Sequence, residues 1–296
     1  MDPLVRFRDA HSKGLIPDDI YDLTLKRFPI VVAGINRIEK ASGIQYPIAY
    51  VEPSLVLSSS NSNSYEYGIL FARTIPVMFE EKFVDVIHEI DVPVGYGFGS
   101  SAAVALSLSI ALNDALECKL SKIKVAQIAH DVEIECKTGL GDVLASYHGG
   151  FEIRDKPGAP GIGHVQKIAL NEISIIMICF SPISTSKFIK ERLPQINGLG
   201  GKMVNKLLES KNYEHFQEMS LEFAKYVDVM TPRMQKVVNE LSKNNIKCGI
   251  ALFGETIFSM IPKEKENKVL EILKKYSDGI IIKSELDNVG ARVLHN

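Results

Sequence analysis

Several features that would place the chain in a particular class of protein are missing from its sequence. Its four cysteines lie far apart, with no CxxC pair and no histidine beside them at the spacing of a metal site: they are Cys118, Cys136, Cys179 and Cys248. We therefore expect buried or half-buried free thiols in a reducing compartment rather than a disulfide framework or a metal centre.

A strong charge of one sign and long apolar runs are also lacking. The formal net charge is -2, so electrostatics give no reason to expect nucleic acid or an anionic membrane as a partner. No apolar run approaches the ~20 residues that span a bilayer. The N-terminal stretch MDPLVRFRDAHSKG is charged and lacks the apolar core of a signal peptide. These absences predict a soluble cytoplasmic protein.

What is present is a pattern of elements that divides at the turn PGAPG, residues 157–161. Before the turn, the apolar spacing predicts helix at 19–42, strand up to Val92, helices at 102–116 and 121–135, and strand near 151–154. After it, the order is strand, helices, two strands, helix and strand, at residues 173–180, 186–243, 247–253, 256–262, 263–276 and 279–283. Gly254 and Glu255 are the expected turn between the two adjacent strands.

That second order is typical of a ferredoxin-like, split βαβ unit with a helical insertion. The 296 residues are enough for two cores of ordinary domain size. We therefore predict an α+β protein with an N-terminal domain at residues 1–160 and a ferredoxin-like C-terminal domain at residues 161–296.

A glycine-rich stretch, PVGYGFGSSAA at residues 93–103, lies between a predicted strand and a buried helix. Glycines permit sharp turns and a close backbone approach to a ligand, and the first N–H groups of a helix point at any anion in the loop. Ser100 and Ser101 add hydroxyls suited to phosphate or Mg²⁺. The stretch has neither the lysine of a Walker A loop nor GxGxxG spacing. By itself it fits a phosphate site or a tight structural turn.

Carboxylates suited to phosphoryl transfer follow this stretch. Such transfer needs Mg²⁺, which takes hard oxygen ligands, and a group that orients or deprotonates the attacking hydroxyl. Ser101 and Glu133 offer metal-binding oxygens, and His130 lies on the same helical face as Glu133; the alternative for Glu133 is a solvated helix carboxylate. Asp142, after the loop TGLG, could lie partly desolvated beside phosphates or could cap a helix.

The motif PVGYGFGSSAAVAL resembles the phosphate-binding motif of the GHMP kinases (galactokinase, homoserine kinase, mevalonate kinase and relatives). Within that superfamily, residues 93–260 are similar to the archaeal pantoate kinase group. The segments that carry this similarity are HDVEIECKTGLGDV (130–143), GGFEIRDKPGAPGIG (149–163), PISTSKF (182–188) and GIALFGETIF (249–258). The resemblance implies a ribosomal S5 domain 2-like N-terminal domain and a ferredoxin-like C-terminal domain, with ATP and Mg²⁺ bound.

The resemblance also implies roles for individual residues. Asp142 would be the catalytic base, and Ser101 and Glu133 would hold the metal. Three residues would bind the acceptor: His130, Arg154 and Thr185. The phosphates of ATP would be bound by Pro93, Gly95, Gly97, Gly99, Ser100, Ser101 and Ala102. Two alternatives stay open: Arg154 could form a surface ion pair with Glu152 or Asp155, and Gly254 could bring the second domain close to the site or simply close a hairpin.

The predicted function is ATP-dependent phosphorylation of the primary hydroxyl of pantothenate or pantoate in coenzyme A biosynthesis, with a homodimer as a possible assembly. Residues 1–92 depart from the group, because its Ser-Pro-Gly-His-type segment is matched here only by FRDAHS at residues 7–12. The acceptor is therefore open, and a mevalonate phosphate is an alternative. A nucleotide-binding regulatory protein without turnover is another, but the joint presence of Ser101, Glu133 and Asp142 argues against it.

Overall fold

The computed structural model describes residues 92–136, 141–183 and 185–293. The helix predicted at 19–42 and nearly all of the strand predicted up to Val92 lie outside these residues. No helix in the described ranges is long and apolar enough to cross a membrane.

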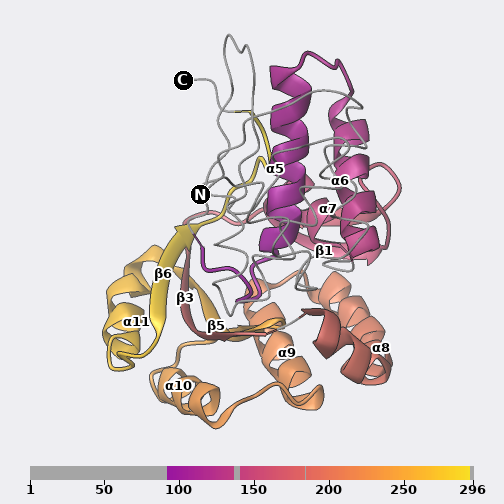
Figure 1. Ribbon diagram of the computed structural model, residues 1–296. Coiled ribbons are helices and arrows are strands. Elements are labelled where there is room, and N and C mark those ends of the chain that lie inside the picture. The colour runs from indigo at the N-terminus through magenta and orange to yellow at the C-terminus, as the bar shows by residue number, and fades with distance from the viewer. Residues whose placement is uncertain (1–91, 137–140, 184, 294–296) are drawn as a thin grey trace, which may run out of the picture.

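Three helices form the part of the described chain that precedes the sheets (Figure 1): α5 (Ser100–Ala115), α6 (Lys122–Cys136) and α7 (Asp142–His148). Alanines let α5 and α6 approach closely, and Ala105 and Ala129 are fully buried in their shared core. The Ser121 hydroxyl accepts a hydrogen bond of 3.2 Å from the Lys124 N–H and so caps the N-terminus of α6.

A β-hairpin follows, made of β1 (Phe151–Lys156) and β2 (His164–Ile168). The turn PGAPG connects these two paired strands, so a division of the chain at residue 160 would separate them. The division into domains stays a prediction, and the pairing favours a boundary after Ile168. Alternation along β1 buries Ile153, which packs on Met203, Leu207 and Met219 of the following helices.

The second sheet has the strand order β4-β5-β3-β6, with every neighbouring pair antiparallel. Its strands are β3 (Ile173–Pro182), β4 (Gly249–Ala251), β5 (Gly254–Pro262) and β6 (Ile280–Glu285). The helices of this half are α8 (Thr185–Ser210), α9 (Tyr213–Tyr226), α10 (Pro232–Lys243) and α11 (Glu266–Leu273), with the short η1 (Lys263–Lys265) before α11. This is the ferredoxin-like order, and α8 and α9 form the predicted helical insertion.

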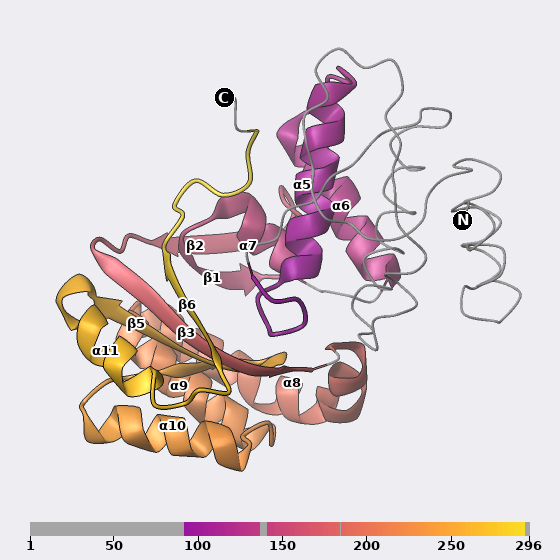
Figure 2. The same ribbon diagram turned by 60° about the vertical axis from the view of Figure 1, so that its left-hand side comes forward.

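The two faces of this sheet have different partners because side chains alternate along its strands. On one face, Ile176, Ile178 and Ile257 pack against α10 and α11 and form the main core (Figure 2). On the other face, Met177 and Phe258 line a cavity below the N-terminal helices. The sheet therefore serves both as the core of one half and as the floor of the cavity.

Helix α9 covers the edge of the sheet beside the short strand β4. The Gln217 side chain is fully buried and bonds both the N–H and the C=O of Met260, at 2.7 and 3.1 Å. The Ser220 hydroxyl does the same for Ile250, at 3.0 Å in each direction. These side chains satisfy strand-edge groups that would otherwise be buried without partners.

The hairpin between β4 and β5 differs from the prediction. Its turn is formed by Leu252 and Phe253, while Gly254 and Glu255 already belong to β5. A glycine next to an acidic residue suggested a turn, but here both residues are buried within a strand.

The expectation of free cysteines is confirmed. None of the four cysteines forms a disulfide; Cys179 and Cys248 are buried and the other two are half-buried. Burial raises the pKa of Cys248 to about 12, so its thiol stays protonated at neutral pH.

Candidate active site

The loop that precedes α5 has the backbone of an anion-binding loop. Its three glycines, Gly95, Gly97 and Gly99, have φ values of 83°, 86° and 61°, a region that side-chain-bearing residues rarely adopt. Gly99 is the N-cap of α5, and no side chain caps the helix and no acidic residue lies in its first turn. The first N–H groups of α5 can therefore donate to an anion held in the loop.

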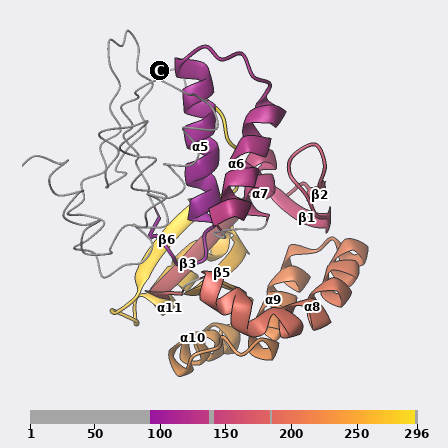
Figure 3. The same cartoon turned by 45° about the vertical axis from the view of Figure 1, so that its right-hand side comes forward.

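The second sheet supports this phosphate loop from below (Figure 3). The Ile183 N–H donates a 3.0 Å hydrogen bond to the Gly95 carbonyl. A Cβ at Gly254 would overlap the Tyr96 carbonyl group, and one at Gly97 would lie 3.0 Å from the Ala251 Cβ. Of the two interpretations of Gly254, close approach of the second half to the loop is the one observed.

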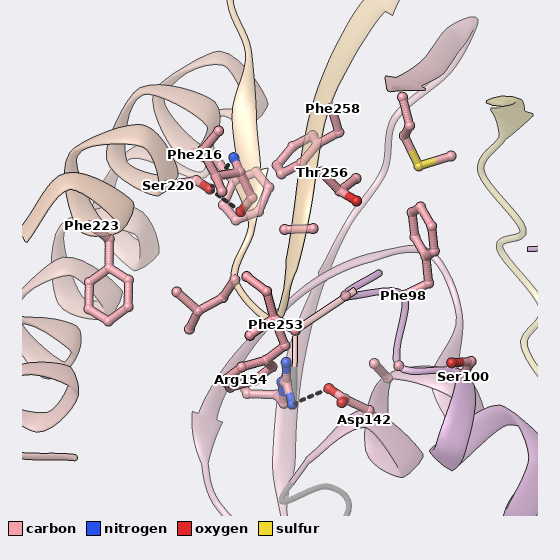
Figure 4. A pocket seen from close by; sticks show the side chains of 18 of the residues that line it. Phe98, Ser100, Asp142, Arg154, Phe216, Ser220, Phe223, Phe253, Thr256 and Phe258 are labelled. Atoms are coloured by element: carbon pink, nitrogen blue, oxygen red, sulfur yellow. Dashed lines mark hydrogen bonds and ion pairs between the residues drawn. The ribbon is translucent and has the colours of Figure 1, made fainter. Parts of the chain in front are cut away.

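Asp142 lies at the end of the phosphate loop. It is the first residue of α7, whose N-cap is Gly141, and no side-chain hydrogen bond caps that helix. A Cβ on Gly99 would lie 3.1 Å from the Asp142 Cβ, so the carboxylate is adjacent to the loop. Figure 4 shows it directed into the cavity, beside Arg154. The capping alternative for Asp142 does not apply.

Arg154 reaches the same place from β1. Residues two apart on a strand share a face, so Arg154 and Glu152 point away from the core that buries Ile153. The Arg154 Nη1 lies 3.8 Å from Asp142 Oδ1, and its Nε lies 3.2 Å from Glu152 Oε1. The guanidinium lies over Gly141, where a side chain would collide with it. The ion pair with Glu152 exists, yet Arg154 also faces the cavity.

Glu152 is a site residue that the sequence did not reveal as one, although its spacing of two from Arg154 was a usable signal. Its side chain is only 7% exposed. Burial raises the pKa of Glu152, the Arg154 guanidinium lowers it, and the nearby Asp142 carboxylate raises it further; the net pKa lies above the usual range.

This raised pKa predicts how a Glu152→Gln variant compares with the wild type in stability. Below the unfolded-state pKa, Glu152 is neutral in both the folded and the unfolded wild type. The stabilities of the wild type and the variant therefore differ least there. As the pH rises from the unfolded-state pKa to the folded-state pKa, Glu152 ionises in the unfolded chain but stays protonated in the folded one, so the wild type loses stability and the variant does not. We expect the melting temperature of Glu152→Gln, relative to wild type, to increase from pH 4 to pH 8. A relative decrease over that range would show that the Arg154 pairing dominates instead.

The phosphate loop, Asp142 and Arg154 all line one cavity of about 860 Å³. At one end lie the loop glycines and the hydroxyl-bearing residues Ser100 and Ser101. The other end is apolar and extends between the sheet and the insertion helices, where Phe216 and Phe258 stack with ring centroids 5.7 Å apart. A phosphate donor and a small acceptor could therefore lie side by side in it.

The other predicted site residues are not among the described residues that line this cavity. Glu133 is only 1% exposed on α6, which excludes a solvated carboxylate, and His130 is half-buried one turn earlier. Neither Glu133 nor His130 lines the described cavity. Pro93, which precedes the loop, and Ala102, which is buried in the helical core, do not line it either. Thr185 is the first residue of α8, and its side chain lies outside the described part.

Comparison with known proteins shows the family of the chain. Residues 69–150 match the family described as the GHMP kinases N terminal domain. Over 193 residues the chain is 35% identical to a pantoate kinase of Methanocaldococcus jannaschii, an alignment that covers 64% of the chain and 69% of that relative. The chain belongs to the pantoate kinase family of GHMP kinases.

Two further relatives support membership of this GHMP kinase family. A pantoate kinase of Thermococcus kodakarensis is 29% identical over 64% of the chain and 63% of its own length. A solved structure titled "Phosphotransferase related to CoA biosynthesis pathway" is 26% identical to the chain, with a TM-score of 0.66. The match covers 76% of this chain and 74% of the chain in that structure. The chain thus aligns with about two thirds of the length of its curated relatives. As a member of the family, it is an ATP-dependent phosphotransferase.

Proposed function

We propose that this GHMP kinase transfers the γ-phosphate of ATP to the primary hydroxyl of pantoate, in the biosynthesis of coenzyme A. One observation carries the proposal: a carboxylate, Asp142, touches the end of an anion-binding loop and faces the same cavity as the Arg154 guanidinium. The names of the relatives favour pantoate over pantothenate.

Pantoate fits the polar groups of the site. It carries a carboxylate, a dimethyl carbon and a primary hydroxyl, so one end can bind a cation while the other reacts. Arg154 offers planar N–H donors that suit a carboxylate, and it already faces a carboxylate oxygen, that of Asp142. Phe253, which lies beside Arg154 in Figure 4, offers apolar surface to the dimethyl group, and Phe98 also lines the cavity.

In this proposal the chain's own groups divide the reaction between them. The N–H groups of the phosphate loop and of the first turn of α5 bind the phosphates and stabilise the charge that develops on them. An oxygen of Asp142 accepts the proton of the primary hydroxyl while the hydroxyl oxygen attacks the γ-phosphorus. The bond between that phosphorus and the β,γ-bridging oxygen breaks, and ADP leaves. The sheet beneath the loop forms one side of the cavity.

Ser101 and Glu133 are suited to hold Mg²⁺. Mg²⁺ usually takes one or two carboxylates or hydroxyls from the protein and fills its other positions with phosphates and water. Ser101, in the first turn of α5, lines the cavity, whereas Glu133 is a buried carboxylate on α6 outside the described lining. When bound, the metal would neutralise charge on the phosphates.

Variants of these two residues test that assignment. We expect Ser101→Ala and Glu133→Gln each to raise the Mg²⁺ concentration for half-maximal activity by about 10-fold or more, a loss typical of weakened metal sites. The KM for the acceptor should stay the same. Ser107→Ala is a matched control, because that hydroxyl bonds the Val104 carbonyl within α5. Unchanged Mg²⁺ titrations in both variants would show that other groups hold the metal.

The proposed function is tested by ADP release from the purified chain with one acceptor at a time. The panel is pantoate, pantothenate, mevalonate, mevalonate 3-phosphate, shikimate and homoserine. Pantoate should give the highest kcat/KM. Turnover of mevalonate 3-phosphate with neither pantoate nor pantothenate would overturn the assignment to coenzyme A biosynthesis while leaving a kinase.

A further inference from the structure

A buried carboxylate outside the reacting centre has an unusually complete set of partners. Glu255, at the start of β5, is 6% exposed. It accepts hydrogen bonds from the Thr231 hydroxyl and from Arg233, whose Nε lies 3.2 Å from Oε1 and whose Nη2 contacts Oε2. The same Nη2 donates to the Ser181 hydroxyl on β3, at 3.2 Å. We call Ser181, Thr231, Arg233 and Glu255 the Glu255 cluster.

The cluster lies where regular pairing between the two central strands stops. β3 and β5 pair residue by residue up to Cys179 opposite Thr256, and then the register shifts before Pro182 opposite Gly254. Backbone hydrogen bonds alone do not fix the strand ends at such an irregularity. The side chains of the cluster join both strand ends to the N-terminus of α10 at that point.

Both strand ends held by the cluster also touch the phosphate loop. Ile183, just beyond β3, donates to the Gly95 carbonyl, and Gly254 lies directly against the Tyr96 carbonyl. Ser181, the cluster residue on β3, is two residues before Ile183, and Glu255, the cluster residue on β5, directly follows Gly254. A shift of either strand end would therefore move the loop on which the phosphates rest.

The chemistry of the cluster suits a fixed support. Burial raises the pKa of Glu255, but hydrogen bonds from Arg233, Thr231 and Ser181 outweigh it, so the net pKa lies below the usual range and the carboxylate stays ionised. Arg233 also pairs with Asp278 at 2.9 Å. A bidentate arginine–carboxylate pair has a defined geometry that a single hydrogen bond lacks.

We propose that the Glu255 cluster positions the phosphate loop for ATP: it holds the ends of β3 and β5 at the spacing that the loop needs. These are positioning residues, because they touch the supporting strands and not the cavity groups that would react. The inference rests on the proposed function only for its ligand, ATP, and is independent of the acceptor.

The test is the affinity for ATP, measured calorimetrically with Mg²⁺ and without any acceptor. We expect Glu255→Gln to weaken ATP binding by roughly 2- to 30-fold, a range typical of network residues that do not contact the ligand. Glu240→Gln is the matched control: Glu240 also pairs with a cation, Lys275 at 2.7 Å, but at a half-buried position farther along α10. It should bind ATP as wild type does. Melting curves establish that each variant is folded.

The outcomes separate this inference from the proposed function. Equal ATP affinity in wild type and in folded Glu255→Gln would overturn the positioning role alone. A wild type that binds no ATP would overturn both. If Glu255→Gln does not fold, Ser181→Ala removes one hydrogen bond of the cluster and decides the same question: weaker ATP binding supports the inference and unchanged binding refutes it.

Discussion

Replacing Asp142 by asparagine should abolish phosphoryl transfer while leaving ATP binding largely intact. The substitution keeps the size of the side chain and its contact with the phosphate loop, but an amide cannot accept the hydroxyl proton. Loss of a general base typically costs about 10²–10⁴-fold in rate. We expect that loss in kcat, with the dissociation constant of ATP within about threefold of wild type, a difference below 1 kcal/mol.

The control for this variant is Asp155→Asn. Asp155 lies on the same hairpin as Arg154, but it pairs with His164 at 2.6 Å and with Gln166 at 2.9 Å, away from the cavity. Its activity should be close to that of wild type. An Asp142→Asn enzyme with more than about a tenth of the wild-type kcat would remove Asp142 from the role of base, since that loss falls short of the range for general bases.

The second large effect is expected from Arg154→Ala. A charge-assisted hydrogen bond contributes ~1.5–3 kcal/mol, and each ~1.4 kcal/mol changes a rate tenfold. The kcat/KM for pantoate should therefore fall by roughly 10- to 150-fold, with little change in the KM for ATP. Pantothenate carries an uncharged amide at the same carbon, so its smaller kcat/KM should fall less.

One complication of this variant follows from the ion pairs of Arg154. Removing Arg154 leaves Glu152 buried without its cation, which could destabilise the chain independently of catalysis. The substitution is therefore best made in a Glu152→Gln background, with Glu152→Gln alone as the reference. Arg192→Ala, which breaks an exposed pair with Asp228, is the control for loss of an arginine. An unchanged kcat/KM for pantoate in the double variant would show that another group reads the carboxylate.

The sequence predicted the second half well because its signals are local. The apolar residues of β3 and the Lys/Glu-rich stretch before β6 fix element types without reference to distant parts of the chain. Strand order then follows from the ferredoxin-like succession. The sharp turn before α5 was also predictable, because glycines that alternate just before a helix permit positive φ; its role in phosphate binding stays a prediction.

The parts that the sequence did not reveal depend on contacts between distant segments. Glu255 was expected in a turn, because a glycine followed by an acidic residue usually marks one. Here a side chain at position 254 would collide with the Tyr96 carbonyl, and Glu255 forms an ion pair with Arg233. The domain boundary expected at the PGAPG turn stays a prediction, whereas the pairing of β1 with β2 across this turn depends on both strands and not on the turn residues. Glu152 likewise becomes a site residue only through Asp142 and Arg154.

The most direct measurement is a competition between two acceptors. The enzyme is given ATP, Mg²⁺ and equal concentrations of pantoate and pantothenate, and the two phosphorylated products are quantified by mass spectrometry during the first part of the reaction. Their ratio equals the ratio of the two kcat/KM values. We predict that phosphopantoate forms in large excess, and that Asp142→Asn forms neither product. An excess of phosphopantothenate, or ATP turnover without either product, would contradict the proposed function.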